Sequence, residues 1–139
     1  MTVTPRPHAS SSHGAIPLGS TVHAFAAQVR TADPIAVRAV LAPLREAFAR
    51  HREATEGAAG IYADVVQDAP RLARTVDGLV AEHECIDAAM ARLAIIATDD
   101  AEAEELRDQA NQVLDTLLRH GRHDARLVHE AYVTDIGGE

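Results

Sequence analysis

The feature that most constrains the fold of this chain is a set of four apolar stripes that repeat at three- and four-residue intervals. This spacing is that of an amphipathic helix, because a half-buried strand alternates every second residue instead. We expect helices over residues 18–31, 34–66, 70–97 and from about 100 to the glycines at 137 and 138. Asp33 can cap the second helix, Pro34 suits its first position, and Pro43 either kinks or restarts it. Short connections between four such helices predict an all-α, antiparallel up-down four-helix bundle.

Composition supports helices over a sheet, since aromatic residues make up 3% of the chain and tryptophan is absent. The net charge of -8 argues against nucleic acid as a partner, because phosphates need a basic surface. No apolar run approaches the roughly 20 residues that span a membrane. The N-terminus lacks the pattern of a signal peptide, and the single Cys85 excludes an internal disulfide. We therefore expect a cytoplasmic location.

The first 16 residues combine proline, serine and glycine without periodicity, and they predict a disordered N-terminal tail that contains His8 and His13. Residues 17–139 are expected to form one helical domain, because they contain no internal repeat and no change in composition that would mark a second domain.

Polar residues interrupt the apolar stripes at corresponding places. His83 and Asp87 are four residues apart on one helical face, and His120 and Asp124 repeat this arrangement. His51 lies on the stripe of the second helix. Counted from the helix boundaries, the three histidines differ in depth by only a few ångströms at about 1.5 Å per residue. They are therefore predicted to lie in one layer of the bundle.

Two further candidates fit this layer less closely. Glu56 follows His51 by five residues, about 140° around the helix. His23 lies beside the first stripe and would be about 15 Å from the layer if the second helix were straight from residue 34. A turn nearer residue 37, or a bend at Pro43, would remove that mismatch.

Energetics favour a metal in this layer. Burying an unpaired carboxylate costs several kcal/mol, and few basic residues share the stripes to neutralise three of them. Imidazole and carboxylate together suit iron, manganese or zinc. Seven potential donors exceed what one ion with an open position needs, so two ions are predicted. The alternative is a metal-free bundle, because a single buried histidine is most often a hydrogen-bonded structural residue.

Other polar residues rank lower as ligands. His123 lies about 60° from His120 and is the reserve ligand, whereas His129 lies about 180° away and should be on the surface or in an interface. Cys85 is expected to be an inert thiol, and Tyr62 is expected to pack in the core.

Four segments together resemble the hemerythrin-like, HHE cation-binding proteins of actinobacterial type over residues 18–139, namely VHAF, RHREATEG, EHECID and RHGRHDARLVHEAY with the final DIGGE. The resemblance implies a four-helix bundle with two non-haem irons joined by an oxo or hydroxo bridge. It implies terminal ligands at His23, His51, His83 and His120, with bridging carboxylates at Glu56 and Asp124.

The chain departs from that pattern at Asp87, where the family has a second histidine, and in the spacing of Glu56 and Asp124 from their histidines. A donor set richer in oxygen favours the ferric state over reversible oxygen carriage. Three functions follow as hypotheses. The first is a di-iron protein that binds or senses dioxygen, peroxide or nitric oxide. The second is an oxidase or a peroxidase- or catalase-like enzyme, which could act on a small metabolite. The third is a metal-free structural or interaction bundle, and no oligomeric state is implied.

Overall fold

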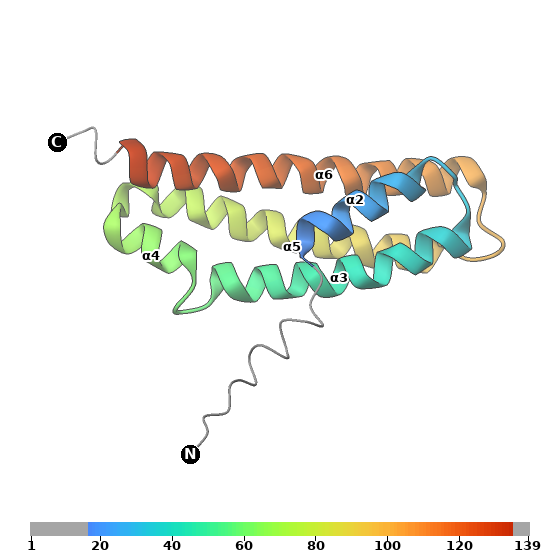
Figure 1. Ribbon diagram of the computed structural model, residues 1–139, viewed down its shortest axis with the longest axis horizontal. Helices are drawn as coiled ribbons and strands as arrows, with labels where there is room; N and C mark the ends of the chain where they lie inside the picture. The colour runs from blue at the N-terminus through green and yellow to red at the C-terminus, as the bar shows by residue number, and fades with distance from the viewer. Residues whose placement is uncertain (1–16, 135–139) are drawn as a thin grey trace, which may run out of the picture.

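A computed structural model of the chain describes residues 17–134, and in this range it contains helices and no strand. The α-helices are α2 (Leu18–Val29), α3 (Pro34–Glu56), α4 (Ile61–Asp68), α5 (Ala73–Ile96) and α6 (Ala103–His129). A 3-10 turn (Pro70–Leu72) precedes α5, and a π-helical turn (Glu130–Thr134) follows α6. Figure 1 shows α5 and α6 running the length of the molecule, α3 running beside most of it with α4 at the left end, and the shorter α2 lying along part of it. The predicted all-α fold with four helices packed against each other is confirmed.

The predicted start of the second helix is also confirmed. The carboxylate of Asp33 accepts a hydrogen bond of 3.1 Å from the backbone N–H of Ile35, and Pro34 occupies the first turn. The residue before this cap, Ala32, has a φ of 53°, which lets the chain reverse between α2 and α3. From there α3 continues through Pro43 without a break in the helix.

The predicted continuous helix over residues 34–66 is wrong, because α3 ends at Glu56 and α4 begins at Ile61. Gly57 leaves the helix in an extended conformation with φ −66° and ψ 166°. At Gly60 the chain passes so close to α3 that an added Cβ would lie 2.6 Å from the carbonyl oxygen of Thr55. Only glycine fits such an approach, and this turn redirects the chain so that α4 packs across the end of the bundle.

Two apolar clusters fill the bundle. The larger lies among α2, α3, α5 and α6, and the smaller lies among α4, α5, α6 and the adjoining turns. Along α5, Val76 and Leu79 belong to the smaller cluster and Ile86 to Leu93 to the larger, with His83 between them. A layer of polar side chains therefore separates the two clusters near the middle of the bundle.

The predicted disordered tail, residues 1–16, and the glycines expected to end the last helix lie outside the described residues. No helix among those described is both long enough and apolar enough to cross a lipid bilayer.

Candidate metal centre

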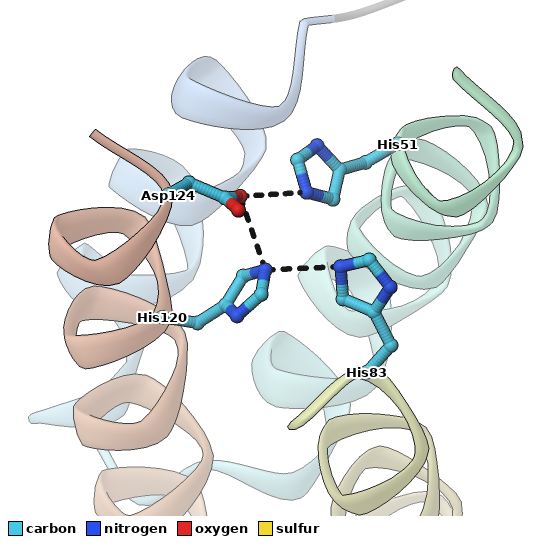
Figure 2. Close-up of side chains that lie close together, drawn as sticks. All are labelled: His51, His83, His120 and Asp124. Atoms are coloured by element: carbon cyan, nitrogen blue, oxygen red, sulfur yellow. Dashed lines mark hydrogen bonds and ion pairs between the residues drawn. The ribbon is translucent and has the colours of Figure 1, made fainter. Parts of the chain in front are cut away.

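Four side chains from three helices meet in the polar layer. His51 comes from α3, His83 from α5, and His120 and Asp124 from α6. Figure 2 shows all four pointing toward one another in the space between the helices. One potential ligand atom from each lies within 4.8 Å of the others. Helix α2 contributes nothing to this group, which we call the His/Asp cluster.

The distances within the cluster suit a transition-metal ion. Nε2 of His120 lies 3.0 Å from Nε2 of His83 and 3.1 Å from Oδ2 of Asp124. Nε2 of His51 lies 3.1 Å from the same Asp124 oxygen. Neighbouring ligands around an octahedral ion with bonds near 2.1 Å are about 3 Å apart, so an ion could be bound with little movement.

Burial differs among the four residues. His83 and His120 are buried, with exposed fractions of 0% and 3%. His51 and Asp124 are half-buried. The cluster therefore has a closed side and a side closer to solvent.

Carboxylates orient the two buried histidines from behind. Nδ1 of His83 donates a hydrogen bond to Glu56, and Nδ1 of His120 donates one of 2.6 Å to Glu82. Because a carboxylate only accepts, these bonds put a proton on each Nδ1, and in a neutral ring the Nε2 atom that faces the cluster is then the one that can bind a metal. Carboxylate–histidine pairs of this kind are typical of metal sites, where they fix the ring and raise its basicity.

Both carboxylates are held in turn. Arg52 donates to Glu56 from Nε at 2.9 Å, which lowers the mobility of the group behind His83. Glu82 accepts a second hydrogen bond of 2.6 Å from Nδ1 of His123. Glu82 was not among the predicted site residues, although it directly precedes a predicted ligand. Glu82 could have been predicted from the rule that Nδ1 of a metal-ligating histidine usually donates to a carboxylate or a carbonyl.

Tyr62 contributes more than the predicted core packing. Its buried hydroxyl donates a hydrogen bond of 2.5 Å to Oδ1 of Asp124 and lies 3.5 Å from Nε2 of His83. Burial, reinforced by the bond to Asp124, raises the pKa of Tyr62, so that the hydroxyl stays protonated. The bond occupies one oxygen of Asp124 and leaves the other facing the histidines.

Three of the seven predicted ligands lie outside the cluster. Asp87 accepts a hydrogen bond of 2.5 Å from Nη1 of Arg52, and Glu56 lies between that arginine and His83. His23 is exposed on α2 and is not one of the four residues of the cluster.

The expectation that few basic groups would neutralise these acids is corrected by Arg52. This residue follows His51 on α3, about 100° around the helix, and its long side chain reaches Glu56, Asp87 and Glu84. His129 is exposed, as predicted, and Cys85, which was predicted to be an inert thiol, is exposed and lies outside the cluster.

Hydrogen bonds and burial shift the pKa values of the cluster in opposite directions. Burial alone would raise the pKa of Asp124, but bonds with His120, His51 and Tyr62 hold it well below its ordinary value. Burial would lower the pKa of His120, but bonds to Asp124 and Glu82 outweigh it and raise that pKa. For His83 burial is the larger effect, and its pKa falls. In the metal-free fold these shifts make His120, and not His83, the histidine of the buried pair that more readily holds an added proton.

One side of the cluster is closed and the other opens to a hollow. Phe48 closes it from within α3, with its ring centroid 5.4 Å from that of His83 and 6.4 Å from that of His120. The hollow lies between α2 and α6, has a volume of about 470 Å³, and includes His51, His120 and Asp124 in its lining. His23 also lines it, from the α2 side.

Comparison with known proteins adds no assignment: no family model matches this chain, and no curated protein or solved structure shows significant similarity to it. The resemblance to hemerythrin-like proteins therefore rests on the helical bundle and on the buried His/Asp cluster.

Proposed function

We propose that this protein is a non-haem metal protein, with iron as the preferred metal, that binds or reacts with dioxygen, peroxide or nitric oxide. The observation that carries the proposal is the convergence of three imidazoles and one carboxylate from three helices. Two of those imidazoles are backed by glutamates, as metal-ligating histidines usually are. Donors of this kind suit iron, manganese or zinc.

The arrangement leaves room for a small ligand. Four protein donors do not fill the five or six positions that iron uses, and the free side of the cluster faces the hollow. Bound iron would supply the electrons needed to bind or reduce an oxygen species. The protein would hold the donors in place through Glu56, Glu82 and Tyr62, while Phe48 keeps water from the closed side.

We propose one ion per chain in place of the two predicted from the sequence. A second ion would require Glu56 and Asp87 to leave Arg52, and His23 to move inward from the surface of α2. Breaking two half-buried ion pairs costs free energy that a second ion would have to supply. Metal analysis after loading with ferrous iron should give about one ion per chain. A value near two would restore the dinuclear site.

Stopped-flow absorption tests the function itself. The chain is loaded with ferrous iron without oxygen and mixed separately with nitric oxide, dioxygen and peroxide, with His120→Ala as the control. We expect absorption changes that the control lacks. Formation of a stable ferric product would favour an oxidase or peroxidase, and release of oxygen under vacuum would favour a carrier. Absence of any change in the iron-loaded protein contradicts the proposal.

A metal-free structural role is the second candidate, and a specific observation favours it. Both ring nitrogens of His83 and of His120 already have hydrogen-bonding partners within the protein. Such a layer could set the helix register without an ion. In that case a chelator would leave the Tm unchanged, whereas bound metal stabilises the folded state in proportion to its affinity.

A further inference from the structure

The hollow beside the His/Asp cluster has mainly aliphatic walls. Leu18 and Val22 line it from α2, and Leu114, Leu117 and Leu118 line it from α6. Leu118 remains 46% exposed at this wall. The volume of the hollow, about 470 Å³, falls within the range of small-molecule sites, which combine apolar walls with a few polar groups. Dioxygen or nitric oxide needs far less space.

Two glycines keep the hollow wide. Gly19 on α2 and Gly121 on α6 both line it, and a Cβ at either position would meet no atom within 4 Å. A glycine inside a helix costs about 1 kcal/mol relative to alanine. At Gly121, in the middle of α6, no neighbouring atom demands that cost. The space itself is what the glycine provides.

The polar end of the hollow is the cluster. His51, His120 and Asp124 line it, and no lysine or arginine is among the lining residues. An anion entering the hollow would therefore be neutralised by a bound metal and not by a basic side chain. A divalent ion held by one aspartate and three neutral imidazoles keeps a net charge of about +1, which one negative oxygen balances.

We propose that the hollow binds a small organic monoanion with an apolar body and one anionic oxygen-containing head group, such as an aliphatic carboxylate or a phenolate. The head group points to the His/Asp cluster, and the body packs against the leucines of α6 and the first two turns of α2. This inference rests on the proposed metal centre, because the metal supplies the positive charge.

Titration calorimetry on the metal-loaded protein tests the inference with three kinds of probe. Octanoate and 4-propylphenol carry both head and body, acetate carries only the head, and 1-octanol carries only the body. Each buried methylene contributes to affinity, so we expect octanoate or 4-propylphenol to bind about tenfold or more tightly than acetate and 1-octanol. If octanoate binds, the head group is a carboxylate, and if 4-propylphenol binds, it is a phenolate. A shift in the absorption of the bound metal should accompany binding.

Substitutions at the glycines locate the binding. Gly121→Leu fills the hollow from α6, and Gly19→Leu fills it from α2, which provides no residue of the cluster. Both should weaken octanoate or propylphenol about tenfold while the metal content and acetate binding persist. Gly78→Leu is the matched control, since Gly78 is an exposed glycine of α5 with open space above it and does not line this hollow.

The outcomes separate the two proposals. A chain that takes up no metal contradicts the proposed function and, with it, this inference. If metal is bound but neither octanoate nor propylphenol exceeds both acetate and octanol, the inference alone is overturned. The same follows if Gly19→Leu and Gly121→Leu bind these probes as tightly as Gly78→Leu.

Discussion

Two histidine–aspartate pairs in this protein have the same spacing and different partners. His83 and Asp87 on α5, like His120 and Asp124 on α6, are four residues apart and so share a helical face. Asp124 turns to His51 and His120, whereas Asp87 turns to Arg52. Helical spacing thus determines which residues share a face, and the neighbouring helix determines whether an acid is available to a metal.

Solvent exposure follows the same division. The side chain of Asp124 is 21% exposed and that of Asp87 is 46% exposed. Asp87 belongs to a group at the edge of the bundle, in which Arg52 also holds Glu56 and the more exposed Glu84. This arginine-centred group neutralises its acids without a metal. The His/Asp cluster contains no lysine or arginine, and it is there that a cation would be stabilised.

The largest loss of metal affinity is expected from the substitution of Asp124. Asp124→Ala removes a donor from the cluster, so we expect metal affinity to fall by about 100-fold or more. Asp87→Ala removes a partner of Arg52 and should change metal affinity by less than about tenfold. Competition with a chromophoric chelator measures both. Equal losses in the two variants would mean that Asp87 is a ligand, as the sequence pattern predicted.

A smaller effect is expected from the glutamates behind the histidines. Glu56→Gln and Glu82→Gln weaken the hydrogen bonds that orient His83 and His120, and each should lower metal affinity about 10- to 100-fold. Glu84→Gln is the matched control, because Glu84 contacts Arg52 at the surface and no residue of the cluster. A loss in the control as large as in Glu56→Gln would show that the charge of the arginine-centred group matters more than histidine orientation.

Metal removal should lower the Tm by several degrees, equivalent to about 1–3 kcal/mol, and by more at pH 8 than at pH 6. In the metal-free fold the raised pKa of His120 stabilises the protein below the ordinary histidine value near 6.5, and this contribution is lost as pH rises through the raised pKa. Metal must displace that proton, so its stabilising effect grows with pH. Thermal melts with and without chelator measure the difference, which His120→Ala should abolish. An equal difference at both pH values would contradict the assignment of the proton to His120.

Much of the fold could be predicted because it depends on local patterns. The spacing of Val76, Leu79 and Ile86 on α5 and the cap at Asp33 are decided by residues close together in the chain. The break before α4 was not predicted, because it depends on Gly60 passing close to the carbonyl of Thr55. A glycine in the sequence does not by itself indicate such a contact. For this reason helix boundaries are harder to predict than helices.

The candidate site, like the fold, was predicted in part. The histidines of α3, α5 and α6 and Asp124 were found from their helical phase and depth. The competition of Arg52 for Glu56 and Asp87 could not be predicted, because it depends on how a long side chain reaches between helices. The hydroxyl of Tyr62 was missed for a similar reason: its partner lies 62 residues away, on α6.

The smallest effect on metal affinity is expected at Tyr62, whose hydroxyl is the one group of α4 that contacts Asp124 in the described hydrogen bonds. Tyr62→Phe keeps the ring and leaves Oδ1 of Asp124 without its donor. A lost hydrogen bond to a partly buried carboxylate costs about 1–3 kcal/mol, so the metal-free variant should melt several degrees lower. In the metal-bound form the freed oxygen can turn to the cation, which offsets part of this cost, and metal affinity should change less than about tenfold. Melting curves and chelator competition on the same samples separate the two effects. A loss of affinity as large as that of Asp124→Ala would mean that the tyrosine oxygen itself belongs among the donors, and that the His/Asp cluster extends to α4.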